Sequence, residues 1–162
     1  MRKIFQKELD MILHWNLTLV GGFLGTYAIL LHAGNFGSAQ TGNLISFVMD
    51  LVGRTDAEIF FRFSALLIYI FAMVSTVFLS HKMERTTLKF ISVLIDGLAF
   101  VLLAFLPQDM DPFVALYPIF FATAFQWCSF KGADGFNSSS IFSTNNLRQC
   151  TTGFAEYLYS RD

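Results

Sequence analysis

The sequence contains few charged residues. Only 14% of its 162 residues are Asp, Glu, Lys or Arg, whereas about a quarter are charged in an ordinary soluble domain. That is too little charge to coat a small soluble globule, and the 54% apolar content excludes a disordered chain. A net charge of −1 gives no electrostatic reason to expect nucleic acid as a partner. We therefore expect a single domain embedded in a lipid bilayer.

Motifs for catalysis and metal binding are also missing. The two cysteines, Cys128 and Cys150, form no CxxC pair, and we interpret them as free thiols. There is no HExxH, no GxSxG, no glycine-rich phosphate loop followed by Lys, and no pair of carboxylates on one helix face. We therefore expect a protein that is not an enzyme and needs no cofactor or metal.

Charged residues are absent, or nearly absent, from four stretches of the chain. These stretches are residues 11–49, 63–80, 86–106 and 112–130, and only the third contains charges, Lys89 and Asp96. A helix needs about 20 apolar residues to cross a bilayer core of about 30 Å. Residues 63–80 lack the polar face that a helix of a soluble bundle would show. The pattern predicts an all-α polytopic membrane protein with four or five full transmembrane helices.

The first stretch divides into a helix, a polar segment and a second, shorter helix. We expect the first helix over residues 12–31, retained rather than cleaved as a signal peptide. Gly21 and Gly25 form a GxxxG pattern beside Gly22, which allows another helix to approach closely. Residues 32–40 are small and polar, and the following helix over residues 41–52 spans only about 18 Å. This short helix is half as long as a membrane crossing requires.

Two interpretations of this short helix stay open. If it crosses and the N-terminus is cytoplasmic, basic residues divide almost evenly between the two sides, against the positive-inside rule. If it re-enters and returns to the same side, seven of the nine basic residues up to Lys131 lie inside, and the other two, Arg54 and Arg62, lie outside. The count favours re-entry with a cytoplasmic N-terminus. A crossing made of an extended piece plus a half-helix remains the alternative.

A second polar segment, at residues 131–143, resembles the first. Thr41-Gly42-Asn43-Leu44 matches Thr144-Asn145-Asn146-Leu147 at three of four positions with an offset of 103 residues. Each box follows an apolar helix and opens a short helix, so we predict an internal repeat, inverted under the re-entrant interpretation. Its units would be residues 1–56 and 112–162 of one transmembrane domain, residues 1–162.

These boxes supply the best candidate for a binding site. Backbone N–H groups at a helix start lack intrahelical partners, and the helix dipole makes that end positive, so it can hold an anionic or polar group. We expect the ligand-binding groups to be Gln40, Thr41, Gly42, Asn43, Asn137, Thr144, Asn145 and Asn146. The alternative is that these polar groups only satisfy one another where the helix is broken.

Asp96 is the clearest ionisable residue at membrane depth. It lies midway along the third apolar stretch, where a charge is costly and therefore a candidate for function. We consider a proton-coupling role for Asp96, and a structural carboxyl facing the bundle as the alternative. Asp50 is expected to pair with Arg54 four residues later, and Arg62 to reach the membrane interface.

The residues of both boxes carry a family resemblance. Gly21 to Tyr27, followed by Phe36 to Asn43, is similar to the start of the YoaK-like bacterial integral membrane proteins, a family defined by a domain of unknown function. The stretch from Phe125 to Leu147 resembles that family's second signature, with Asn145 in place of the usual Gly. The resemblance covers nearly the whole chain and implies a multi-pass protein of the bacterial inner membrane. Family members usually continue through a further helix, so the chain looks short at its C-terminus.

Together these features predict a transporter or permease for a small polar or anionic solute. Its site would lie between the two opposed helix starts. The chain is expected to contact the lipid bilayer. Because so few helices enclose little volume, it is also expected to form a homo-oligomer. The alternative function is a non-transporting membrane scaffold or regulatory protein.

Overall fold

The computed structural model describes residues 2–32, 34–53, 56–107, 109–130, 132, 139–140 and 143–160, without the side chains of residues 2–6, 56–57 and 143–144. Within these residues the chain is helical and forms no strand. The helices are α1 (Arg2–Leu31), α2 (Gln40–Gly53), α3 (Asp56–Lys82), α4 (Arg85–Phe105), the 3-10 helix η1 (Val114–Leu116), α5 (Tyr117–Ser129) and α6 (Ser143–Tyr159). The prediction of an all-helical fold is confirmed.

Local sequence explains where the helices begin and end. α4 stops at Phe105 because Leu106 precedes a proline and takes an extended conformation. Ahead of η1, one Asp111 carboxylate oxygen accepts hydrogen bonds from the backbone N–H groups of Phe113 and Val114, at 2.8 and 3.2 Å. The helix predicted over residues 111–130 is divided into η1 and α5, and α5 carries Pro118 in its first turn. α1 begins ten residues before the predicted start, because the N-terminal lead-in continues the same helix.

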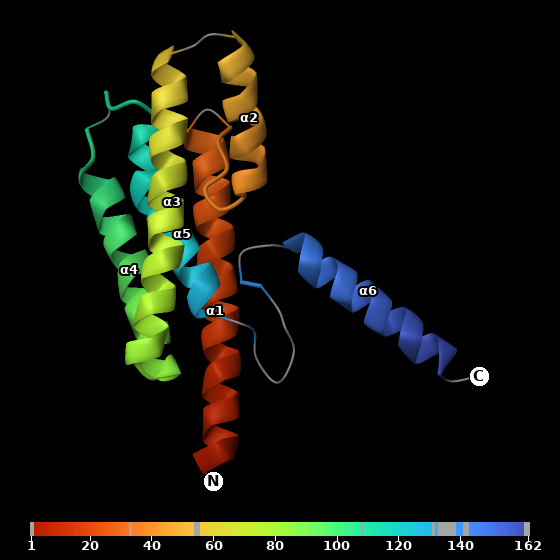
Figure 1. Cartoon of the computed structure of the whole chain (residues 1–162). Helices are drawn as coiled ribbons and strands as arrows, with labels where there is room; N and C mark the ends of the chain where they lie inside the picture. The colour runs from red at the N-terminus through yellow and green to blue at the C-terminus, as the bar shows by residue number, and fades with distance from the viewer. Residues whose placement is uncertain are drawn as a thin grey trace.

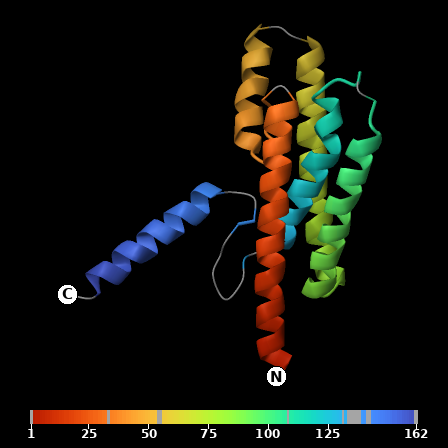
Figure 2. The ribbon, with the colours of Figure 1, turned by 180° about the vertical axis from the view of Figure 1, so that it is seen from behind.

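The chain runs up and down a bundle in which α5 is central (Figures 1 and 2). α5 packs against α3 and α4, and α2 packs against α3. α1 and α5 run in opposite directions, since Leu17 lies beside Gln126 and His32 lies beside Pro112. α6 extends away from the other helices.

The link between α1 and α2 turns back along α1, and α2 then runs toward the end of the bundle where α1 finished (Figure 1). α2 has 14 residues and is therefore about 21 Å long. The N-terminal end of α1 and the turn between α3 and α4 lie at the opposite end, where Lys89 pairs with Asp10. The C-terminal ends of α1 and α2 therefore lie at the same end of the bundle.

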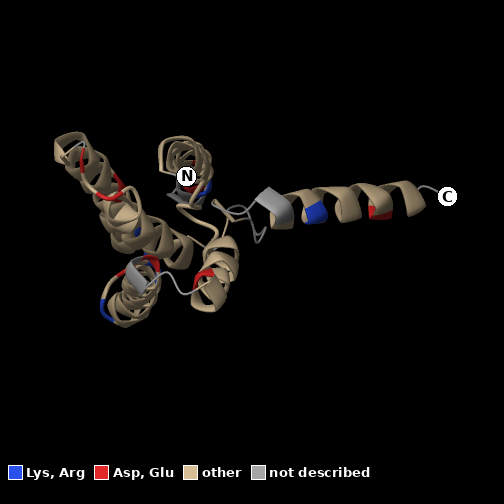
Figure 3. Cartoon of the chain, turned by 90° about the horizontal axis from the view of Figure 1, so that it is seen from above, with Lys and Arg blue, Asp and Glu red and all other residues tan. Residues whose placement is uncertain are grey.

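Apolar side chains cover the outside of the bundle, and polar ones lie within it. Phe71, Leu94 and Phe105 are more than 60% exposed. Fully buried polar residues include Thr76, Ser92, Thr123 and Gln126. Seen from above, Lys, Arg, Asp and Glu are sparse on the bundle (Figure 3). Among the described residues, two helical segments are long and apolar enough to cross a membrane, Glu58–Lys82 and Arg85–Phe105; Val114–Ser129 is apolar but shorter.

Candidate functional site at two broken-helix segments

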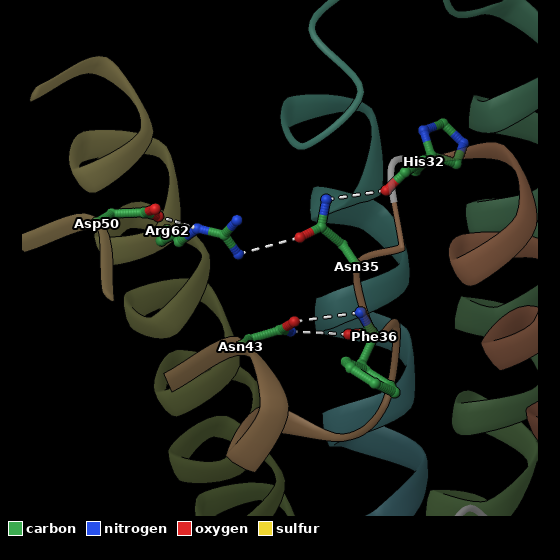
Figure 4. Close-up of polar contacts among 6 residues, drawn as sticks. All are labelled: His32, Asn35, Phe36, Asn43, Asp50 and Arg62. Carbon is green, nitrogen blue, oxygen red and sulfur yellow. Dashed lines mark hydrogen bonds and ion pairs between the residues drawn. The ribbon is translucent and has the colours of Figure 1, made fainter. Parts of the chain in front are cut away.

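The Asn43 side chain holds the segment between α1 and α2 in place. Its Oδ1 accepts the backbone N–H of Phe36 at 3.1 Å, and its Nδ2 donates to the Phe36 carbonyl at 2.8 Å (Figure 4). The amide thus pairs with the unwound backbone as a neighbouring strand would, which satisfies two groups that have no helical partner. Asn43 is only 5% exposed, so these bonds are sheltered from competing water.

Asn146 holds the second segment in the same way. Its Oδ1 accepts the N–H of Ser139 at 3.0 Å, and its Nδ2 donates to the Ser139 carbonyl at 2.6 Å. Asn43 and Asn146 are 103 residues apart, and so are Phe36 and Ser139. α2 and α6 also begin 103 residues apart, at Gln40 and Ser143. The offset found in four sequence positions therefore extends to equivalent hydrogen bonds and equivalent helix starts.

The start of α2 is tightly packed. A Cβ added to Gly42 would lie 2.6 Å from the Phe36 ring, so Gly42 leaves room for that ring. A Cβ at Gly37 would lie 2.9 Å from Ile119 and 3.0 Å from Ala28, which places the segment directly against α1 and α5. We therefore assign Gly42 a packing contact, in addition to the ligand contact predicted for it.

The glycines of α1 have different surroundings. Gly21 is buried, and a Cβ at Gly25 would meet the Ser38 hydroxyl at 3.6 Å. Gly22 is exposed, and a Cβ there would meet no atom within 4 Å in the described part of the chain. Gly25 thus faces the first broken segment, and Gly21 is buried, whereas Gly22 lies on an open side of α1 in the described part of the chain.

Both broken segments converge on one turn of α5. The Thr123 hydroxyl lies 2.9 Å from the Gly37 carbonyl and 2.8 Å from the Ile119 carbonyl of its own helix, so it has one proton for two acceptors. The Gln126 amide donates to the Ser140 hydroxyl at 3.2 Å and to the Leu17 carbonyl at 2.9 Å. Gly37 and Ser140 are again 103 residues apart. Equivalent positions of the two segments are therefore bound by α5 residues three positions apart.

A second polar cluster joins α2, α3 and the first segment. The Arg62 guanidinium pairs through Nε with Asp50 and donates from NH1 to the Asn35 side chain at 3.0 Å (Figure 4). It also lies 4.9 Å from the centre of the Phe113 ring. The side chains of Arg62 and Asp50 are each 16% exposed. Asp50 thus pairs with Arg62; the pairing predicted with Arg54 stays a prediction, because Arg54 lies outside the described residues.

Some buried polar atoms near the segments have no hydrogen-bond partner among the described residues. They include Gln40 Nε2, a donor at the start of α2, and Gln126 Oε1, an acceptor on α5. Burying a polar atom without a hydrogen bond costs free energy, and a bound ligand could supply the missing bond. A pocket of about 210 Å³ lies elsewhere, beside His32, Leu103 and Pro112. No group of three His, Cys, Asp or Glu side chains in the described ranges could hold a metal ion.

The predicted site residues meet different outcomes. Asn43 and Asn146 are bound to backbone; Thr41 is exposed, and Asn145 is partly exposed. Asn137 and the Thr144 side chain lie outside the described residues. Sequence reasoning missed Thr123 and Gln126, because a polar residue in an apolar helix does not reveal which segment it binds.

Comparison with known proteins identifies the family. The model of the family described as "Protein of unknown function (DUF1275)" matches residues 13–162. The chain therefore belongs to this family. Neither the curated proteins nor the solved structures gave a match.

Proposed function

We propose that this DUF1275 protein is a multi-pass membrane protein of the YoaK-like type, located in the bacterial inner membrane. α1, α3, α4 and the pair η1–α5 would cross the bilayer, and α2 and α6 would enter it only partway. The outward-facing apolar side chains and the buried polar ones support this assignment, because a surface in lipid is apolar and polar groups at membrane depth must be satisfied inside the protein. Basic residues concentrate at the end that carries the N-terminus, which favours a cytoplasmic N-terminus.

Within this arrangement, we propose that the protein transports a small polar or anionic solute. The observation that carries this proposal is the convergence of Gly37 and Ser140, two non-helical residues at equivalent positions, on one turn of α5. Unwound backbone at membrane depth is tolerated where it is buried in protein or lines a cavity. Paired discontinuous helices in opposed repeats are typical of transporter binding sites. The opposite directions of α1 and α5 are consistent with an inverted repeat.

The solute would bind beside α5, between the two segments. Gln40 Nε2 offers an unpartnered donor at the start of α2, where the helix dipole also favours an anion. Gln126 Oε1 offers an unpartnered acceptor. One donor and one acceptor suit a small solute with both kinds of group. A homo-oligomer would enlarge the enclosed volume and is part of the proposal.

Purified protein tests this proposal in two steps. A thermal-shift screen against small anions and polar metabolites should find a solute that raises the Tm, and liposomes containing the protein should take up that solute. Gln40→Met removes the unpartnered donor without breaking a hydrogen bond, so its Tm without solute should be unchanged while uptake falls at least tenfold. Asn16→Leu, which removes an exposed amide of α1, is the control and should keep normal uptake.

The packed start of α2 favours a second candidate, a non-transporting membrane scaffold. The Phe36 ring covers Gly42, and both Asn43 side-chain bonds are used within the protein. If no solute in the panel shifts the Tm or enters liposomes, the scaffold becomes the better assignment.

A further inference from the structure

Two buried polar residues on α4 have no partner. Asp96 is 3% exposed and Ser92 is 0% exposed, and they lie four residues apart on the same helix face. Neither carboxylate oxygen of Asp96 has a hydrogen-bond partner among the described residues, nor does the Ser92 hydroxyl. Three buried oxygens thus gather on one face of α4, in a stretch whose other residues from Phe90 to Phe105 are apolar.

The pair lies in the middle of the bundle. α4 contacts α1 below the pair through Lys89 and Asp10, and above it through Phe100 and Phe23. Leu17, which Gln126 binds, falls between these α1 contacts. Asp96 therefore lies at about the level at which α5 binds the second broken segment.

Among the residues that the structure describes, no cation pairs with Asp96. The nearest base along α4, Lys89, is occupied by Asp10 and by the Phe130 ring. The other titratable groups on the surrounding helices are His14 on α1, Tyr69 on α3, and Tyr117 and Cys128 on α5. Within the described chain none of them hydrogen-bonds an Asp96 oxygen.

The chemistry of Asp96 and Ser92 suits a proton better than a metal cation. An ionised, unpartnered carboxylate at membrane depth costs several kcal/mol. A metal cation such as Ca²⁺ or Mg²⁺ needs about six oxygen ligands, whereas a proton needs one. Ser92 supplies a hydroxyl that can donate to the carboxylate or accept from the carboxylic acid.

We propose that Asp96 binds and releases the proton that drives transport, and that the Ser92 hydroxyl, unpartnered among the described residues, hydrogen-bonds Asp96 in one of its two protonation states. A proton from water forms an O–H bond on Asp96, which makes the side chain neutral. When that bond breaks, the proton returns to water on the other side of the membrane, and no group is oxidised or reduced. This role rests on the transport function proposed above.

Infrared difference spectroscopy of the full chain in lipid tests the role directly, with pH as the only variable. The carbonyl-stretch band of a protonated carboxyl group should lose more than half its intensity as pH rises, and should return on reacidification. Asp96→Asn should abolish this band, whereas Glu84→Gln, at an exposed acid just before α4, should leave it unchanged. Ser92→Ala should change the proton affinity about fivefold to tenfold, because it removes the hydroxyl that, in the proposal, hydrogen-bonds one protonation state of Asp96.

Three outcomes would overturn the proposal, in whole or in part. A band that persists at every pH would make Asp96 a permanently neutral structural residue. Absence of any band that depends on Asp96 would exclude it as the proton carrier. An unchanged titration in Ser92→Ala would remove the role of Ser92.

Uptake measurements separate this proposal from the transport proposal. If Asp96 titrates but no solute moves, transport fails and the carrier role fails with it, leaving only a titrating carboxyl. If a solute moves and Asp96 does not titrate, the proton proposal alone fails. If both hold, Asp96→Asn liposomes should lose accumulation driven by a pH gradient while keeping solute exchange at equal pH.

Discussion

Asn43 and Asn146 make the same pair of hydrogen bonds to the backbone seven residues before them. Each side-chain amide supplies the hydrogen-bond partners that an unwound peptide group would otherwise lack inside the bundle. The side chains differ in their surroundings, since Asn43 is buried and Asn146 is partly exposed. This difference makes the two boxes a natural pair for mutational comparison.

Asn43→Asp should destabilise the protein by about 1–3 kcal/mol, because the carboxylate cannot donate to the Phe36 carbonyl and leaves that group unpaired. Asn146→Asp should cost less, because water can reach its site. Unfolding in a mild detergent, followed by circular dichroism, measures both, with Asn145→Asp as the control. Equal losses at the two positions would show that burial does not set the cost.

Gly42→Ala should destabilise the protein by about 1–3 kcal/mol, because the new Cβ would overlap the Phe36 ring. Phe36→Leu in the same chain should recover part of the loss, and the coupling in a double-mutant cycle measures the contact. Gly22→Ala is the matched control, since its added Cβ meets no neighbour among the described atoms and alanine favours the helix. A Gly22→Ala variant as unstable as Gly42→Ala would contradict this placement.

Arg62→Ala should be more destabilising than the double variant Asp50→Ala with Arg62→Ala, because the single change leaves a half-buried carboxylate without its cation. Arg62→Lys should recover only part of the stability, because an ammonium group cannot reproduce the planar fork that reaches Asp50 and Asn35. Thermal unfolding of each variant gives the order. The exposed Arg85→Ala serves as control and should change the Tm little.

Single cysteines in a chain lacking Cys128 and Cys150 test whether α2 re-enters the membrane. Glu8→Cys and Lys82→Cys should react with an impermeant maleimide from one side, and Gly53→Cys and Asp109→Cys from the other. The decisive comparison is Glu8 with Gly53, because a crossing α2 would place both on the same side. Labelling of intact and of opened vesicles distinguishes the two arrangements.

The sequence predicted the helices well, because the absence of charge and the length of an apolar run can be read from one segment, without knowing what that segment packs against. The offset of 103 residues also indicated that the two boxes are alike. It did not indicate that each Asn binds the backbone seven residues earlier, since that bond depends on how the segment folds back. The Asp50–Arg62 pair was missed for a related reason. Arg54 was the nearer candidate along the chain, whereas the packing of α2 against α3 brings Arg62 to Asp50.

The hydrogen bond between Thr123 and the Gly37 carbonyl joins positions 86 residues apart, which has a consequence for biosynthesis. α1 to α4 leave the ribosome before α5, so the first broken segment must wait for its partner while the nascent chain inserts. A bare carbonyl in hydrocarbon is costly, and we therefore expect the segment to stay in water or in the insertion machinery until α5 is made. Assembly of the bundle would then finish with α5, and a defect in that helix would expose the unwound segment to quality-control proteases.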